Sequence, residues 1–222
     1  MRLIRTDTYR FESFEEVECP RYAILSHRWE AEEVSLQDAL SSCIKKLNSN
    51  GARKIRASCK IALQHRLKYI WVDTCCIDKT SSAELSEAIN SMFGWYQLAE
   101  LCIAYLSDVE LGQSIESSLW FTRAWTLQEL IAPQHVRFYS TNWQLLGSKV
   151  EHAEGISTRT NVPQEVLVYT TNIYLLPIAQ RMLWARNRKS TRVEDIAYSL
   201  LGIFDVNTPL LCVTTDNQSR SE

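Results

Sequence analysis

The chain has 222 residues, of which 45% are hydrophobic and 23% are charged, and its formal net charge is -2. This composition fits a globular domain with one sizeable core and excludes a disordered chain, which needs low hydrophobicity and high net charge. With 24 basic and 26 acidic residues there is no basic surplus, so we expect no nucleic-acid partner. No apolar run reaches the length of a membrane span, and residues 1–10 lack the apolar stretch of a secretory signal.

In the first two thirds of the chain, short apolar runs alternate with amphipathic segments. The apolar runs predict strands at 22–26, 69–72, 101–106 and 136–139. Between them, apolar residues recur at helical spacing, as in Ile55, Cys59 and Ala62. Alternating strands and helices are typical of a parallel sheet with helices on both faces, so we predict an α/β fold.

Capping patterns place two of the connecting helices. Ser81-x-x-Glu84 has the form of a capping box and precedes an apolar stripe. Ser118 is a candidate cap for a helix that runs to about Ala132, where Pro133 ends it.

After Gly147 the alternation of apolar runs and amphipathic segments stops. Residues 150–187 indicate irregular helices, and Thr191-x-x-Glu194 is a further capping box before a helical stripe over 193–204. We therefore predict a single domain over 1–212, with a core at about 20–145 and a helical C-terminal extension at about 150–206. Residues 213–222 are polar and are expected to form a flexible tail.

The seven cysteines are unevenly spaced, and no C-x-x-C pair occurs, so we expect no metal site. Free thiols indicate a cytoplasmic protein. Cys59, Cys75 and Cys102 lie in apolar segments and are predicted to be buried.

Six segments together resemble the fungal heterokaryon-incompatibility (HET) domain family, in the order that family has them. They are Tyr22-Ala-Ile-Leu-Ser-His-Arg-Trp29, Tyr69-Ile-Trp-Val-Asp-Thr-Cys-Cys-Ile-Asp78, Ala83-Glu-Leu-Ser-Glu-Ala-Ile-Asn-Ser-Met92, Ala104-Tyr-Leu-Ser-Asp-Val109, Trp120-Phe-Thr-Arg-Ala-Trp-Thr-Leu-Gln-Glu-Leu130 and Thr191-Arg-Val-Glu-Asp-Ile-Ala-Tyr-Ser-Leu-Leu-Gly-Ile-Phe204. The resemblance implies a role in nonself recognition and programmed cell death, as the effector part of a larger receptor or beside an NLR-like partner.

The HET family has itself been likened to the TIR domain, a doubly wound parallel sheet. Ser26-His27-Arg28 corresponds to the first strand-end loop of a TIR domain, and Trp125-Thr-Leu-Gln-Glu-Leu130 is similar to the TIR segment Trp-Cys-Leu-x-Glu-Leu. The resemblance implies that Glu129 is the catalytic residue of an NAD+-cleaving enzyme that self-association activates. NAD+ is then a substrate, and no cofactor is expected.

One carboxylate is enough for this chemistry, because nicotinamide leaves as a neutral molecule and needs no general acid. The carboxylate holds the ribose hydroxyls and stabilises an oxocarbenium-like transition state. Around Glu129, the indoles of Trp29 and Trp125 are candidates for stacking, and Arg28 and Arg123 are candidates for pairing with the pyrophosphate. Ser26, His27 and Asp73 end predicted strands, where ligands of doubly wound sheets bind, so we expect Glu129 at the rim of a cleft beside Ser26 and Asp73.

Each of these residues also has a structural interpretation. Thr126-x-x-Glu129 is itself a capping box, and Glu129 is otherwise a solvated helix carboxylate. Trp120 and Trp125 suit a core, Asp73 a turn, His27 a hydrogen-bonded loop, and Arg28 an ion pair with Glu30 or Glu32. Two further functions therefore stay open, namely a non-enzymatic module that assembles partners and a cysteine hydrolase that uses Cys76 with His27 and Asp78.

Overall fold

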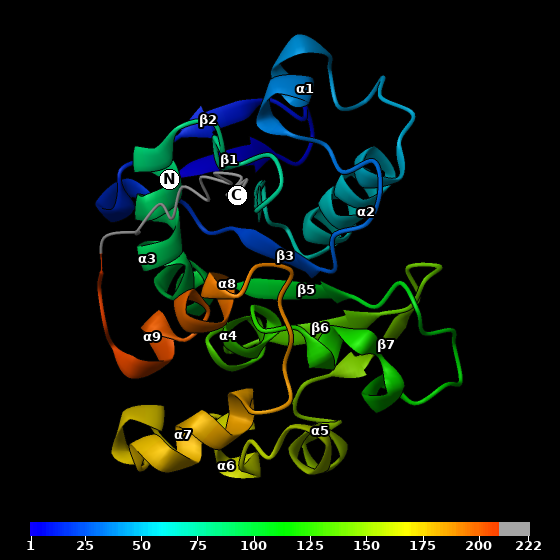
Figure 1. Cartoon of the computed structure of the whole chain (residues 1–222). Helices are drawn as coiled ribbons and strands as arrows, with labels where there is room; N and C mark the ends of the chain where they lie inside the picture. Colours follow the sequence, from blue (N-terminus) through cyan, green and yellow to red (C-terminus); the bar gives the residue numbers. More distant parts are fainter. Residues whose placement is uncertain (209–222) are drawn as a thin grey trace, which may run out of the picture.

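A computed structural model describes residues 1–208, and the predicted tail and Cys212 lie outside the described residues. The fold is a mixed α/β sheet of seven strands with helices packed around it (Figure 1). Its strand order is β2-β1-β4-β3-β5-β6-β7. The strands are β1 (Arg2–Arg5), β2 (Phe11–Ser13), β3 (Ala23–His27), β4 (Tyr69–Val72), β5 (Leu101–Tyr105), β6 (Val136–Tyr139) and β7 (Leu145–Ser148).

The centre of the sheet is parallel and confirms the four predicted strands. β3 pairs with β4 on one side and with β5 on the other, and β5 pairs with β6, all in parallel. Every residue of β3 and β5 is buried. This is why both read as continuous apolar runs in the sequence rather than as alternating ones.

Three antiparallel strands border this core, and the sequence did not predict them. β1 pairs with β4 and β2 pairs with β1, while β7 pairs with β6. β1 has only two buried residues, Leu3 and Ile4, between two arginines. β7 contains Gly147 and has no fully buried residue. Such short border strands bury too little apolar surface to leave a period-2 signal.

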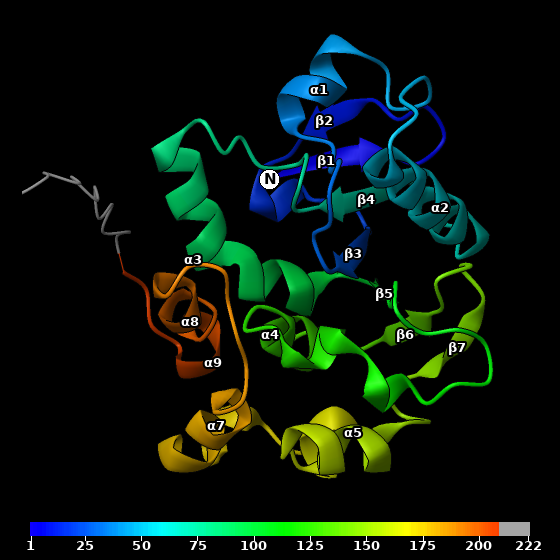
Figure 2. The same ribbon diagram turned by 45° about the vertical axis from the view of Figure 1, so that its right-hand side comes forward.

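The connecting helices cover both faces of the sheet. Figure 2 shows α2 (Asn50–Gln64) on one side and α3 (Ser82–Leu98) on the other. The Ser49 and Ser81 side chains cap these two helices by accepting from the backbone N–H three residues on. At α3 the box is incomplete, because Glu84 accepts from the Asp78 N–H. A short α1 (Leu36–Ser41) precedes α2 and carries a complete capping box at Ser35.

The predicted single helix over 118–132 is wrong. Ser118 caps a 3-10 turn, η3 (Leu119–Thr122), which follows a similar turn, η2 (Ile115–Ser117). The backbone is extended at Arg123, and α4 (Thr126–Ile131) begins only afterwards. A distant residue, Lys189, stabilises this break between η3 and α4. The Ala124 N–H donates to the Lys189 carbonyl, and the Lys189 N–H donates to the Thr122 carbonyl.

Short helices fill the C-terminal part of the described chain. They are α5 (Ala153–Thr160), α6 (Gln164–Leu167), η4 (Ile173–Leu175), α7 (Ile178–Ala185), α8 (Glu194–Tyr198) and α9 (Leu201–Phe204), and a further turn, η1 (Glu16–Glu18), lies near the N-terminus. The capping box at Thr191 is wrong, because α8 starts after Val193 without a side-chain cap. The stripe over 193–204 is split into two helices, and α9 packs on α3. Within residues 1–208, no helix is long and apolar enough to cross a membrane.

The cysteines of the described residues are all free, as predicted. Cys59, Cys75 and Cys102 are fully buried, and burial raises the pKa of the Cys59 and Cys102 thiols. A protonated thiol without solvent access is a poor nucleophile. The predicted triad of Cys76 with His27 and Asp78 is not formed, since the Cys76 thiol accepts from the Val72 N–H and the Asp78 carboxylate binds Thr80.

Thiol labelling of the native protein should therefore be slow at Cys59, Cys75, Cys76 and Cys102 and fast at the exposed Cys43. The measurement is mass spectrometry of peptides after a timed reaction with a maleimide. Labelling of the four buried thiols at the rate seen in denaturant would contradict the packing described here.

Candidate functional site

The strand order creates a switch point at the carboxyl ends of β3 and β5. The chain leaves β3, forms β4 on one side, and then crosses to form β5 on the other side. The connections after β3 and β5 therefore diverge, and ligands of doubly wound sheets bind where this happens. Ser26 and His27 end β3 at this point, in register with Ala104 and Tyr105 of β5.

Glu129 reaches this switch point from α4. The Ser26 hydroxyl donates to the Glu129 carboxylate over 2.5 Å, and the Trp120 indole N–H donates to the same hydroxyl over 2.8 Å. Ser26 and Trp120 are completely buried, and Glu129 is 6% exposed. The late start of α4 brings Glu129 here, because a helix beginning at Ser118 would place it about 15 Å along the axis.

Both structural interpretations of Glu129 are wrong. Its side chain is neither solvated nor part of a capping box, since Thr126 lies within the helix and its hydroxyl donates to the Trp120 and Arg123 carbonyls. Burial raises the pKa of Glu129 to about 7, the Ser26 hydrogen bond opposes this, and the Asp73 carboxylate adds to it. A carboxyl group whose pKa is raised to near 7 in this way is typical of functional sites.

Arg188 is a further charged residue beside Glu129, and the sequence did not single it out. Its guanidinium is buried, and it donates to the Arg123 carbonyl over 2.9 Å and to the Thr126 hydroxyl over 3.0 Å. Burial lowers the pKa of Arg188, and the charge of Glu129 raises it. Its Nη2 atom is buried and has no hydrogen-bond partner within residues 1–208. Arg188 thus ties the segment after α7 to the start of the helix that carries Glu129.

His27 lies between two carboxylates at the end of β3. Its Nε2 is 3.3 Å from Glu33 and its Nδ1 is 3.8 Å from Asp73. Burial raises the pKa of Glu33, but the hydrogen bonds from His27 and Lys54 outweigh this and hold it at about 2. The Lys54 ammonium is buried and pairs with Glu33 and Glu30. Lys54 therefore belongs to a buried ion-pair cluster and not to a solvated helix face.

The remaining predicted residues are divided between two places. Trp29 and Asp73 meet, since the Trp29 indole donates to the Asp73 carboxylate over 2.6 Å. Trp29 is 47% exposed, and the Lys79 ammonium lies over its ring, 3.6 Å from the centroid. Arg28 does not pair with Glu30 or Glu32 but lies 3.7 Å from Asp108. Within residues 1–208, its Nε is buried without a hydrogen-bond partner, as is the Asp73 Oδ1.

Arg123 and Trp125 flank the start of α4. The Arg123 charge lowers the pKa of Glu129, and its carbonyl is bound by Arg188. Trp125 is half-buried against the core at the position just before the helix. The structure thus brings Ser26, Glu129 and the backbone at Arg123 together on one side, and His27, Trp29 and Asp73 on the other.

The site is closed around Glu129. Two pockets, of about 370 Å³ and 280 Å³, lie elsewhere, and neither is lined by Glu129 or by another predicted site residue. The predicted cleft at Glu129 is therefore not among them. Among residues 1–208, no cluster of His, Cys, Asp and Glu could hold a metal ion. The chemistry available is that of a buried carboxyl group, a hydroxyl group and a guanidinium.

Fold and site together define an α/β domain with a candidate ligand site at the switch point of its sheet. A family model described as "Heterokaryon incompatibility protein (HET)" matches residues 22–114. The chain is 42% identical over 205 residues to "Vegetative incompatibility protein HET-E-1" of Podospora anserina. This match covers 86% of this chain and 15% of that protein. The chain therefore belongs to the heterokaryon-incompatibility family. No solved structure is significantly similar to it.

The two matches differ in what they cover. The family model includes Ser26, His27 and Asp73 but ends before Arg123 and Glu129. The chain spans about 15% of the length of the curated relative.

Proposed function

We propose that this chain is a cell-death effector domain of fungal heterokaryon incompatibility, and that it cleaves NAD+ with Glu129 as the catalytic residue. The name of its relative supports the biological role. The observation that carries the chemistry is the buried Glu129 carboxyl group, hydrogen-bonded to Ser26 at the switch point. The sheet order and this carboxyl group are the features that a TIR-like enzyme requires.

In the proposed reaction, the bond between nicotinamide N1 and ribose C1′ breaks, and nicotinamide leaves with the electron pair. The oxygen of a water molecule bonds to C1′, and one of the two protons of that water goes to solvent. The ionised Glu129 carboxylate stabilises the positive charge that develops on the ribose. Trp29 is a half-exposed aromatic ring and a candidate for stacking, with the Lys79 ammonium over its ring. Arg28, whose Nε has no hydrogen-bond partner within residues 1–208, is a candidate for binding the pyrophosphate.

Activation in this proposal is an opening of the site. Glu129 is 6% exposed, so a substrate reaches it only if α4 moves relative to β3. Self-association, or a receptor to which the domain is joined, supplies that change in the cytoplasm. Since the chain covers 15% of its relative, such a receptor part in the same polypeptide is consistent with the proposal.

The test is NAD+ consumption by concentrated purified protein. Wild type should consume NAD+ and release nicotinamide, and Glu129→Gln should lower the rate at least 100-fold, because it removes the charge and keeps the shape. Glu154→Gln is the matched control, since Glu154 is an exposed glutamate on α5, and its rate should equal that of wild type. Both variants are also expressed in fungal cells to score killing.

A second function is favoured by the closure of the site. Because the Glu129 side chain is only 6% exposed, the same fold is also suited to act as a scaffold that assembles partners without catalysis. Cell killing by Glu129→Gln at the wild-type level would refute the enzymatic proposal and establish the scaffold in its place.

A further inference from the structure

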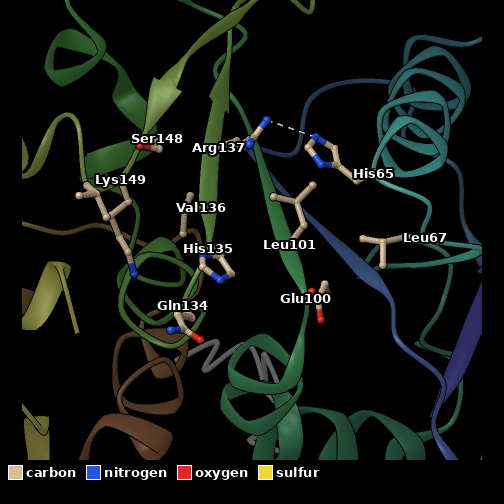
Figure 3. A pocket seen from close by; sticks show the side chains of 11 residues that line it. His65, Leu67, Glu100, Leu101, Gln134, His135, Val136, Arg137, Ser148 and Lys149 are labelled. Atoms are coloured by element: carbon tan, nitrogen blue, oxygen red, sulfur yellow. Dashed lines mark hydrogen bonds between the residues drawn. The ribbon is translucent and has the colours of Figure 1, made fainter. Parts of the chain in front are cut away.

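A second candidate site lies at the opposite edge of the sheet from Ser26 and Glu129. It is the pocket of about 370 Å³, which opens at the amino ends of β5 and β6, beside Leu101 and Val136 (Figure 3). The end of α2, the loop before β6 and the end of β7 complete its wall. Its volume lies in the range that small-molecule ligands occupy.

The wall of this pocket contains a guanidinium without a carboxylate partner. Arg137 lies 3.3 Å from the Nε2 atom of His65, and the two side chains point toward one another in Figure 3. Burial, and then the charge of Arg137, lower the pKa of His65, so the imidazole is neutral and accepts from Arg137. Within residues 1–208, no carboxylate lies within 4.0 Å of the Arg137 guanidinium.

The acidic residue of the wall, Glu100, forms an ion pair with Arg21. Both of its oxygens accept from Arg21, over 2.6 Å and 3.2 Å. The hydrogen bond from Arg21 and its charge lower the pKa of Glu100, and His135 contributes in the same direction. The Arg21 guanidinium thus offsets part of the negative charge that would repel an anion from the pocket.

Lys149 adds a second cation to the same wall. Its side chain is 1% exposed, and the ammonium donates to the Leu130 and Pro133 carbonyls at the end of α4. Neither of these partners carries a charge, and burial lowers the pKa of Lys149 to about 7, so Lys149 carries only part of a positive charge at neutral pH. Gln134 and Ser148 supply neutral polar groups, while Leu101 and Val136 form an apolar part of the lining.

We propose that this pocket binds a small phosphomonoester. Arg137 pairs with the phosphate oxygens by charge-assisted hydrogen bonds, and His65 and His135 flank them. The apolar lining contacts the carbon skeleton of the ligand. Nothing in the proposed NAD+ chemistry uses these residues, so this site stands independently of the proposed function.

The experiment titrates the full chain with inorganic phosphate and with glycerol 3-phosphate at constant ionic strength. Backbone amide signals are followed by NMR. Both ligands should shift the signals of residues 134–137 and 148–150 in a saturable way, with glycerol 3-phosphate binding more tightly. Arg137→Gln should weaken the binding of both about tenfold, which is the effect of one lost hydrogen bond to a charged group.

Two variants separate the site from general effects of charge. Gln134→Glu keeps the shape of an exposed side chain and adds a negative charge to the pocket, so it should also weaken binding. Arg53→Gln removes an exposed charge from α2 and should leave binding unchanged. Glu129→Gln should also leave it unchanged, since Glu129 lies at the other edge of the sheet. Absence of saturable shifts in wild type, or equal binding by Arg137→Gln, would overturn the proposal.

Discussion

Replacing Arg188 by methionine should lower the free energy of unfolding by about 3 kcal/mol, the size expected when one member of a buried polar network is removed. The buried guanidinium donates to the Trp184 and Arg123 carbonyls and to the Thr126 hydroxyl. Methionine fills most of the volume but supplies no donor, so these acceptors lose their partner. The measurement is urea denaturation followed by tryptophan fluorescence.

The matched control is Arg186→Met, the same substitution at an exposed position two residues earlier, which should change stability little. Arg188→Lys should fall between the two, because an ammonium keeps the charge but cannot reproduce the planar set of donors. If Arg188→Met is as stable as Arg186→Met, the segment after α7 does not hold the start of α4 as described.

The central strands were predictable because their apolar runs are local and continuous. β3 and β5 are buried on both faces, and a run such as 101–105 cannot be mistaken for a surface segment. The border strand β1 was not predictable, since Leu3 and Ile4 between two arginines are too few to set a period. Its pairing with β4 brings together residues about 65 positions apart.

The candidate site was predictable in part, and the limit is again long-range contact. The resemblance assigned Glu129 and Ser26, and the structure joins them by a hydrogen bond. The pattern Thr126-x-x-Glu129 allowed a late start of α4, but local sequence could not show the break before it, which depends on Lys189 pairing with the chain at 122–124. For the same reason Arg188 was missed, as its partners at the start of α4, Arg123 and Thr126, lie more than 60 residues earlier.

Glu129→Gln should make the protein more stable at pH 8 and should change its stability much less at pH 5. Burial raises the pKa of Glu129 from 4.5 to about 7 in the folded state. Between these two values the folded protein keeps a proton that the unfolded chain releases, so stability falls as pH rises through this window. Above pH 7 the full penalty of a buried charge applies, about 3 kcal/mol for a shift of this size.

The difference between wild type and variant isolates Glu129 from other titrating groups. Lys149 has its pKa lowered to about 7, so it adds stability as pH rises above 7, and this contribution is present in both proteins. The measurement is denaturant unfolding of wild type, Glu129→Gln and the exposed control Glu154→Gln at both pH values. The control should show no pH-dependent difference from wild type. An equal effect of Glu129→Gln at pH 5 and pH 8 would mean that the carboxyl group is not protonated in the folded protein. Glu129 would then lack the environment on which the proposed catalytic role depends. In that environment the carboxyl group is protonated in the closed site and ionises only when the site opens to its substrate.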